Sequence, residues 1–396
     1  MKNKNVNIKN KALNPTVAKL GMVSFFADVA SEMLYPITPI FLTTILGASA
    51  TFVGVIEGIA EAVASLLKTY SGIWSDRILR RRPFLFAGYF LGAISKPLIG
   101  LSSTWIGVLS ARVIDRTGKG LRSSPRDALI ADSVDASARG AAFGWHRGMD
   151  TLGAAVGPLL ALLLLSFYGD NLRPLYYWAA IPGLFSVLVI FFVKEPASGR
   201  TKSEASKWKN PLSLWGEFGG EFKNYIFAWG IFSLTNSSDV FLLLRARQMG
   251  FSTAGVIWLY CAYNLVYSLS SPYLGKLSDS IGRKKLMLFG MIMFAGVYVG
   301  FAFAGQLWHF AFLFAAYGLY MGATDGVGKA MAVDYAPSRL KASAVGILGT
   351  VTGFCTILAS TMAGLLWDHA GEMWPFLYGA AGALVAAVYL KVLKKI

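Results

Sequence analysis

Long apolar segments separated by short polar stretches make up most of this 396-residue chain. A helix needs roughly 20 mainly apolar residues to cross a bilayer, and twelve segments reach about that length. They lie near residues 17–46, 51–73, 84–103, 105–130, 140–167, 174–193, 224–246, 252–274, 285–304, 308–332, 341–366 and 374–391. The first is too long for one straight crossing, so we expect Pro36 and Pro39 to kink it. The pattern predicts an all-α membrane protein with twelve transmembrane helices.

One longer polar and basic stretch, residues 194–223, separates the sixth segment from the seventh. It predicts a cytoplasmic linker. On either side of it we expect an N-terminal six-helix bundle over residues 1–193 and a C-terminal six-helix bundle over residues 224–396.

The two halves share an internal repeat. Residues 72–82 recur as residues 275–285 at an offset of 203, and residues 126–132 recur as residues 328–334 at an offset of 202. Phe143-Gly144 is then answered by Val345-Gly346 at the second offset. Three matches in order, at nearly one spacing, indicate duplicated bundles.

The composition supports a membrane protein, with 55% hydrophobic residues, 15% charged residues and 42 glycines. The formal net charge of +16 would ordinarily suggest nucleic acid as a partner. However, the basic residues concentrate in the predicted cytoplasmic segments, and the predicted extracytoplasmic ends hold only Arg173, Arg245 and Arg247. This positive-inside bias predicts a bacterial inner-membrane protein with both termini in the cytoplasm and anionic lipids, not nucleic acid, as partners.

The loop after the second segment resembles the signature Gly-x-x-x-Asp-Arg-x-Gly-Arg-Lys-x of the major facilitator superfamily of secondary transporters. The matching residues are Gly72, Asp76, Arg77 and Arg80 to Arg82, and in the second copy Gly275, Asp279, Gly282, Arg283 and Lys284. Leu79 stands where the first copy should have glycine. The resemblance covers essentially the whole chain, and it implies two pseudo-symmetric six-helix bundles that alternate between inward-open and outward-open states.

Two further matches concern coupling and direction. Arg112, in the fourth segment, matches an arginine that the family associates with proton coupling. Gly153-x-x-x-Gly157-Pro158, in the fifth, resembles the family's antiporter motif, although Ala161 and Leu162 replace its closing glycines. The resemblance therefore implies proton antiport, and with it export.

Ionisable residues gather near the predicted bilayer centre, which lies roughly ten residues from a helix end. Such residues are costly in a membrane and usually functional. We predict proton exchange by Asp28, Glu32 or Glu61 next to Arg112. The alternative is a salt-bridge network that only holds helices together.

The cargo is expected to be a small polar solute with negative charge or with both signs, because Arg112, Arg116, Lys119, Arg147 and Lys96 face one region. The predicted substrate-binding residues are Asp28, Glu32, Glu57, Arg112, Asp115, Arg116, Lys119, His146, Arg147, Asp150, Asn236, Asp239, Tyr263, Asn264, Tyr267 and Asp325. For the tyrosine stripe, helix packing is the competing interpretation. Asp325 can also pair with Lys329, four residues later.

The repeated loops predict a cytoplasmic latch in which arginines pair with the aspartate that ends the fourth segment. The predicted gating residues are Asp76, Arg77, Arg81, Asp132, Asp279, Arg283 and Asp334. Plain positive-inside topology is the alternative for the arginines.

The sequence thus favours a monomeric transporter that exports an organic anion, metal chelate or drug by proton antiport. Uptake by proton symport, a non-transporting receptor and a channel are the alternatives. An enzyme is disfavoured, because His146, His309 and His369 are far apart and no nucleophile–base pair or metal motif accompanies them. No cofactor and no bound metal are expected. Cys261 and Cys355 are expected to be packing residues.

Overall fold

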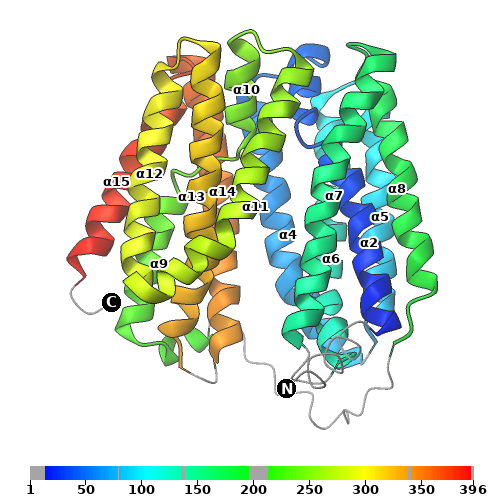
Figure 1. The fold of residues 1–396 in the computed structure, drawn as a ribbon, viewed down its shortest axis with the longest axis vertical. Helices are drawn as coiled ribbons and strands as arrows, with labels where there is room; N and C mark the ends of the chain where they lie inside the picture. Colours follow the sequence, from blue (N-terminus) through cyan, green and yellow to red (C-terminus); the bar gives the residue numbers. More distant parts are fainter. Residues whose placement is uncertain (1–13, 79, 135–138, 196–212, 338–339, 394–396) are drawn as a thin grey trace, which may run out of the picture. The chain divides into compact units, whose positions relative to one another are not determined.

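The computed structural model describes residues 14–78, 80–134, 139–195, 213–337 and 340–393, and their regular structure is helical throughout. The first half contains α2 (Pro15–Glu32), α3 (Thr38–Ile40), the π-helix η1 (Phe41–Ile45), α4 (Ala50–Ile78), α5 (Arg82–Leu101), α6 (Trp105–Asp132), α7 (Arg139–Tyr168) and α8 (Arg173–Phe191). The second half contains the 3-10 helix η4 (Ser213–Glu217), α9 (Gly220–Ser233), α10 (Val240–Gln248), α11 (Thr253–Ile281), α12 (Arg283–Phe303), α13 (Leu307–Asp334), α14 (Lys341–Ala370) and α15 (Trp374–Val392) (Figure 1).

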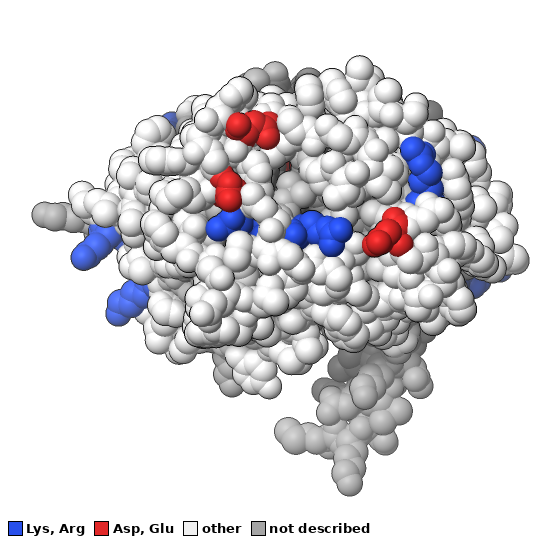
Figure 2. Space-filling view, turned by 90° about the horizontal axis from the view of Figure 1, so that it is seen from above, with Lys and Arg blue, Asp and Glu red and all other residues white. Residues whose placement is uncertain are grey.

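The helices have the apolar surface of a membrane protein. Seven of the helices in the described residues are long and apolar enough to cross a membrane. Large apolar side chains point outward, including Leu101 at 67% exposure, Phe167 at 74% and Phe312 at 69%. Lipid rather than water would solvate these outward apolar side chains. Figure 2 looks from above onto the ends of the helices, and this face is mostly uncharged, with a few scattered acidic and basic side chains.

Local sequence explains where several helices begin. Asn14 caps α2 by accepting from the Val17 N–H at 2.9 Å, and Ser252 caps α11 by accepting from the Gly255 N–H at 3.1 Å. Proline stands in the first turn of α5, α8 and α15, where its missing N–H costs no helical hydrogen bond.

The first predicted span is broken rather than kinked. α2 ends at Glu32, and helical structure resumes only at Thr38. The intervening turn contains Pro36, which has no N–H and disfavours the helical conformation of the residue before it.

The seventh predicted span, 224–246, is also wrong as one helix, because α9 ends at Ser233 and α10 begins at Val240. Between them run Thr235, Asn236, Ser237, Ser238 and Asp239. Short polar side chains compete with the helix for its own backbone groups. The Thr235 hydroxyl, for example, donates to the Phe232 carbonyl at 3.1 Å.

The contacts divide the chain into two compact units. Unit 1 comprises residues 1–38 and 63–207, and unit 2 comprises residues 39–62 and 208–396. The division runs through α4, whose first part belongs with the C-terminal helices. The predicted linker, 194–223, falls partly outside the described residues.

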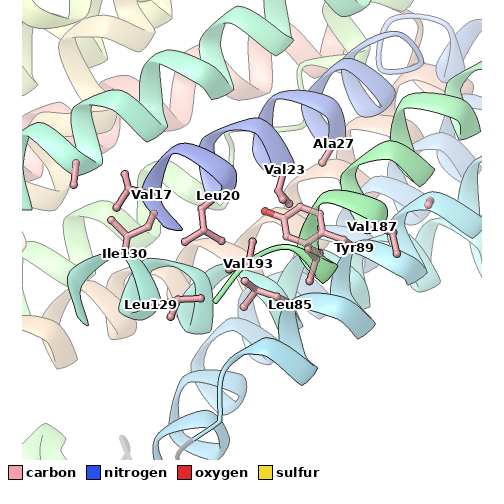
Figure 3. Close-up of a cluster of buried hydrophobic side chains, with 13 residues drawn as sticks. Val17, Leu20, Val23, Ala27, Leu85, Tyr89, Leu129, Ile130, Val187 and Val193 are labelled. Atoms are coloured by element: carbon pink, nitrogen blue, oxygen red, sulfur yellow. The ribbon is translucent and has the colours of Figure 1, made fainter. Parts of the chain in front are cut away.

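Unit 1 is built around a buried apolar cluster. Val17, Leu20 and Val23 of α2 meet side chains of α5, α6 and α8 there (Figure 3). Leu85 and Leu129 are almost fully buried in it. In a membrane, close van der Waals packing of such side chains holds the helices in one arrangement. This arrangement positions the polar residues further along the same helices.

Unit 2 has an aromatic core. Phe294 stacks on Tyr298 with ring centroids 3.9 Å apart, and Phe301 stacks on Phe376 at 5.8 Å. These rings join α12 to α15, while the edge of Phe232, from α9, meets Phe294 at 5.1 Å. Offset and edge-on aromatic pairs give this unit a rigid interior.

Candidate functional site

A polar cavity of about 120 Å³ lies inside unit 1. It is lined by side chains from α2, α5, α6 and α8, and five basic and three acidic residues are among them. If all are ionised, the lining carries two excess positive charges. The charged lining residues are Asp28, Glu32, Lys96, Arg112, Asp115, Arg116, Lys119 and Arg122.

Asp115 lies at the centre of one wall of the cavity, which we call the basic wall and which contains Lys96, Arg112 and Arg116. Its buried carboxylate accepts from the Lys96 ammonium at 2.5 Å and from the Ser95 hydroxyl at 3.2 Å. Its other oxygen lies 4.0 Å from Arg112 Nη1 and 3.9 Å from Arg116 Nε. One carboxylate therefore faces three cations, which leaves this wall cationic although each charge is partly compensated.

Glycines allow α5 and α6 to approach closely enough for these contacts. A Cβ placed on Gly88 would lie 2.6 Å from the Gly118 carbonyl oxygen, so neither helix has room for a larger residue at that level. Close backbone approach at small residues is the usual way in which membrane helices pack. It brings Lys96 and Asp115 together from different helices.

Glycines also allow α7 to pack closely against α2. A Cβ on Gly153 would lie 2.6 Å from the Phe25 carbonyl oxygen, and one on Gly157 would lie 2.8 Å from the Val29 carbonyl oxygen. These are the glycines of the antiporter-like motif, and they pack beside Asp28 and Glu32. The motif therefore supports the acidic wall of the cavity.

The acidic wall consists of Asp28 and Glu32, one turn apart on α2. Arg122 of α6 lies over the Tyr89 ring, 4.3 Å from its centroid, which is a cation–π geometry. The charges of Arg122 and Asp150 both act on Asp28. Acids and bases thus line one cavity.

The predicted residues of α7 do not line this cavity. The His146 Nδ1 atom lies 3.6 Å from the Asp150 carboxylate, and His146 is buried while Arg147 is exposed. The His146 Nε2 atom has no hydrogen-bond partner among the described residues. These residues stand behind the acidic wall.

The predicted polar residues of the second half lie in unit 2. The Asp239 carboxylate accepts from the Tyr263 hydroxyl at 3.0 Å and from the Tyr317 hydroxyl at 2.6 Å. The Asn236 amide donates to the Tyr320 hydroxyl at 3.3 Å. Both hydroxyl groups that donate to Asp239 here are uncharged.

Farther along α11 a second small network forms. Asp325 accepts from the Tyr267 hydroxyl at 2.9 Å and from Lys329 at 2.8 Å, so the predicted Asp325–Lys329 pair is present. Asn264 donates to the Tyr260 carbonyl in its own helix at 2.9 Å. Glu57 and Glu61, on α4, belong to unit 2, and Glu57 is buried at 7% exposure.

The predicted latch residues form two equivalent ion pairs. Arg81 Nε donates to Asp132 at 3.0 Å in unit 1, and Arg283 pairs with Asp334 in unit 2. Each arginine precedes its aspartate by 51 residues, which agrees with the sequence repeat. The side chains of the other predicted latch residues, Asp76, Arg77 and Asp279, lie outside the described part.

Two partners in these sites, Tyr89 and Tyr317, were not predicted from the sequence, and Lys96 was expected only to face the region. A lysine inside an apolar segment is a usable signal. Tyr317 gives no local signal, because its role depends on Asp239, 78 residues away.

Comparison with known proteins decides the family. The family model for the Major Facilitator Superfamily matches residues 20–256 and 225–395. The chain belongs to the Major Facilitator Superfamily. It is 33% identical over 393 residues to an uncharacterized MFS-type transporter of Methanocaldococcus jannaschii, covering 97% of this chain and 96% of that protein.

Two other similarities extend the comparison. The multidrug resistance protein MdtG of Salmonella arizonae is 25% identical over 334 residues, covering 79% of this chain and 77% of that protein. The crystal structure of the nucleoside transporter NupG has a TM-score of 0.75 at 16% identity, covering 97% of this chain and all of that one. The chain is therefore a membrane transporter with the twelve-helix, two-bundle major facilitator fold, and not an enzyme.

Proposed function

We propose that this protein exports a small organic solute in exchange for protons, and that the solute binds in the cavity of unit 1. The observation that carries the proposal is the cavity's two-sided charge: a cationic wall around Asp115 faces Asp28 and Glu32. The multidrug resistance relative supports export of a foreign or waste compound.

The basic wall selects an anionic group. Arg112 and Arg116 can present guanidinium donors to a carboxylate or phosphate, a geometry that arginine suits better than lysine. Lys96 remains engaged with Asp115 and holds that carboxylate away from the solute. The solute's anionic group would thus act as a second counter-ion for these two arginines, beside Asp115.

The acidic wall determines the sign of proton coupling. A purely anionic solute would bind better when Asp28 and Glu32 are protonated, and proton and solute would then move together. A solute that also carries a positive centre, such as an amine or a chelated metal ion, competes with protons for these carboxylates. Antiport therefore calls for an amino-carboxylate, a metal–carboxylate chelate or a drug with both charges.

The ion pairs Arg81–Asp132 and Arg283–Asp334 fit a latch that alternating access must break and re-form. Glu61 of α4 stays a predicted proton carrier. The lipid partner is expected to be anionic, since basic side chains dominate the loops on one predicted side.

Purified protein in liposomes with an internal pH-sensitive dye tests the proposal. Amino-carboxylates and chelates should drive protons against the solute flux, and Arg112→Ala should lower that flux at least about 100-fold by removing the charge beside the carboxylates. Lys391→Ala, at the exposed end of α15, is the matched control and should transport normally.

The same assay decides between the alternatives. Proton movement in the same direction as the solute would replace antiport with symport. Solute binding without flux would indicate a receptor. Full proton-coupled flux in Arg112→Ala would remove this arginine from the mechanism.

A further inference from the structure

The chain between α9 and α10 lies within unit 2 without forming a helix. Residues 234–239 join α9, which ends at Ser233, to α10, which begins at Val240. Irregular backbone inside a membrane protein needs partners for its polar groups, and it persists where protein, water or an ion supplies them. The hydrogen bonds of this break therefore show which kind of partner it lacks.

The Asp239 carboxylate accepts from two tyrosine hydroxyls. Tyr317, on α13, donates to one oxygen at 2.6 Å, and Tyr263, on α11, donates to the other at 3.0 Å. A carboxylate oxygen can accept more than one hydrogen bond, so both oxygens still have lone pairs to offer. Among the described residues, no basic side chain forms an ion pair with Asp239. Its negative charge is therefore not balanced by a fixed cation in that part of the chain.

Two further buried oxygen atoms of unit 2 have no donor in the part of the chain that the structure describes. The Asn236 amide donates through Nδ2 to the Tyr320 hydroxyl at 3.3 Å, while its buried Oδ1 atom has no hydrogen-bond partner. The buried Tyr298 hydroxyl has none either. An unsatisfied buried oxygen is destabilising, so each of these atoms calls for a partner.

Aromatic rings bring these oxygen atoms together. Tyr317 and Tyr320 lie about one turn apart on α13, with ring centroids 5.3 Å apart, so the two residues that they contact, Asp239 and Asn236, are neighbours. The Tyr298 ring lies 6.4 Å from the Tyr317 ring, centroid to centroid. We call the side-chain oxygens of Asp239, Asn236 and Tyr298 the acceptor group.

The helix break adds backbone acceptors. The carbonyl groups of Asn236 and Ser237 accept no backbone hydrogen bond from any described residue. In a continuous helix they would accept from the N–H groups of Val240 and Phe241, but the Phe241 N–H donates instead to the Ser238 carbonyl at 3.2 Å. In membrane transporters, carbonyl groups that unwound helices leave over can coordinate a sodium ion.

The acceptor group and these carbonyls consist of oxygen atoms with a single negative charge. Oxygen ligands favour hard ions, whereas most transition metals favour nitrogen or sulfur. One carboxylate balances one positive charge, so a monovalent ion leaves no excess charge where little water screens it. The surrounding rings are closely packed, with the Phe294 and Tyr298 centroids 3.9 Å apart. Such a site suits a bare ion better than a bulky organic cation.

We propose that the helix break of unit 2 binds one sodium ion, with the Asp239 carboxylate and the Asn236 amide oxygen as its side-chain ligands. Carbonyl groups of the break complete the coordination. The ion balances the charge of Asp239 and supplies the partner that the Asn236 oxygen lacks, while the two tyrosine hydroxyls orient the carboxylate. Bound sodium therefore stabilises the broken arrangement of α9 and α10.

This site goes beyond the proposed solute site, because Asp239 and Asn236 belong to unit 2 and do not line the cavity of unit 1. Its test needs no transported solute. Sodium binding by a protein that moves no solute would leave the sodium site standing. A protein that does not bind sodium would leave the proposal for the unit 1 cavity untouched.

Binding of radioactive sodium to the purified full-length protein is the direct test. The parent should bind sodium saturably, and K⁺ should compete at least about tenfold more weakly than Na⁺, because cavity size and ligand number set the selectivity. Thermal unfolding gives a second readout. At constant ionic strength, replacing choline by saturating Na⁺ should raise the melting temperature by at least about 3 °C, because an ion that binds only the folded state stabilises it.

Three variants locate the ion. Asp239→Asn should weaken sodium binding at least about tenfold and remove the sodium-dependent rise in melting temperature, because it removes the charged ligand. Asn236→Leu keeps every charge and should weaken binding at least about threefold. Glu221→Gln changes an exposed acid in the first turn of α9, so it is the matched control and should bind sodium like the parent.

A parent protein that binds no sodium would overturn the proposal, whether or not the variants fold. Sodium binding that survives unchanged in both Asp239→Asn and Asn236→Leu would place the ion elsewhere and would overturn it as well. If Asp239→Asn does not fold, Asn236→Leu decides alone. An equal loss of binding in Glu221→Gln would also count against the site, since it would reveal a general effect of charge.

Discussion

The two units neutralise a buried carboxylate in opposite ways. In unit 1, Asp115 faces Lys96, Arg112 and Arg116, so its charge is compensated by fixed cations. In unit 2, the Asp239 carboxylate accepts from two tyrosine hydroxyls. A fixed cation makes a permanent charge pair, whereas neutral donors leave the charge state open to change.

The difference teaches where a mobile cation can bind. A carboxylate that is ion-paired with a lysine keeps its charge. It can therefore help to set the electrostatic potential in which an anionic solute binds. A carboxylate that accepts only from neutral donors is suited to binding a mobile cation. The two duplicated bundles thus use different chemistry to neutralise a buried carboxylate.

The largest effect is expected when the Lys96–Asp115 ion pair is lost. Asp115→Ala should destabilise the protein by about 3–5 kcal/mol, because it leaves Lys96 buried without its counter-ion. The double variant Lys96→Met, Asp115→Leu should recover most of the melting temperature. Asp239→Asn should lower it far less. Equal losses for Asp115→Ala and Asp239→Asn would erase the distinction between the two sites.

The ion pairs at the predicted cytoplasmic ends should give the next largest effect. Asp132→Asn and Asp334→Asn should each change turnover several-fold with little change in solute affinity, because each weakens a contact that differs between states. The reciprocal exchange Arg81→Asp, Asp132→Arg should restore part of the rate. Weakened binding at an unchanged rate would argue against a latch.

A smaller effect is expected at the start of α4. The Asp368 carboxylate accepts from the backbone N–H groups of Ala50 at 3.1 Å and Thr51 at 2.8 Å, so it caps this helix from α14. Asp368→Ala should cost about 1 kcal/mol. Thermal unfolding of the purified variant measures this loss. An unchanged melting temperature would show that the cap contributes nothing to stability.

The smallest effect is expected for Lys329→Ala. Its partner Asp325 and Lys329 itself are both substantially exposed, so the pair should contribute no more than about 0.5 kcal/mol to stability. Asp325→Ala also removes the acceptor of Tyr267 and should cost somewhat more. A large loss of stability in Lys329→Ala would show that exposure is a poor guide to the strength of pairs in this protein.

Much of the fold could be predicted from the chain alone. The lengths of the apolar segments located the membrane helices, and the repeated Gly72 and Gly275 loops revealed the duplication. Even the partners Arg81 and Asp132 followed from the repeated motif. The break at residues 234–239 was missed, although five consecutive Thr, Asn, Ser and Asp residues in an apolar span were a visible signal.

The sequence by itself determined the helices and the charges that they carry, because hydrophobic length and helical spacing are local properties. Tertiary structure decided which charges meet. Lys96 reaches Asp115 because Gly88 and Gly118 let α5 and α6 touch, and Tyr317 reaches Asp239 from a helix 78 residues away. Such pairings depend on the packing of distant helices, so no local pattern specifies them.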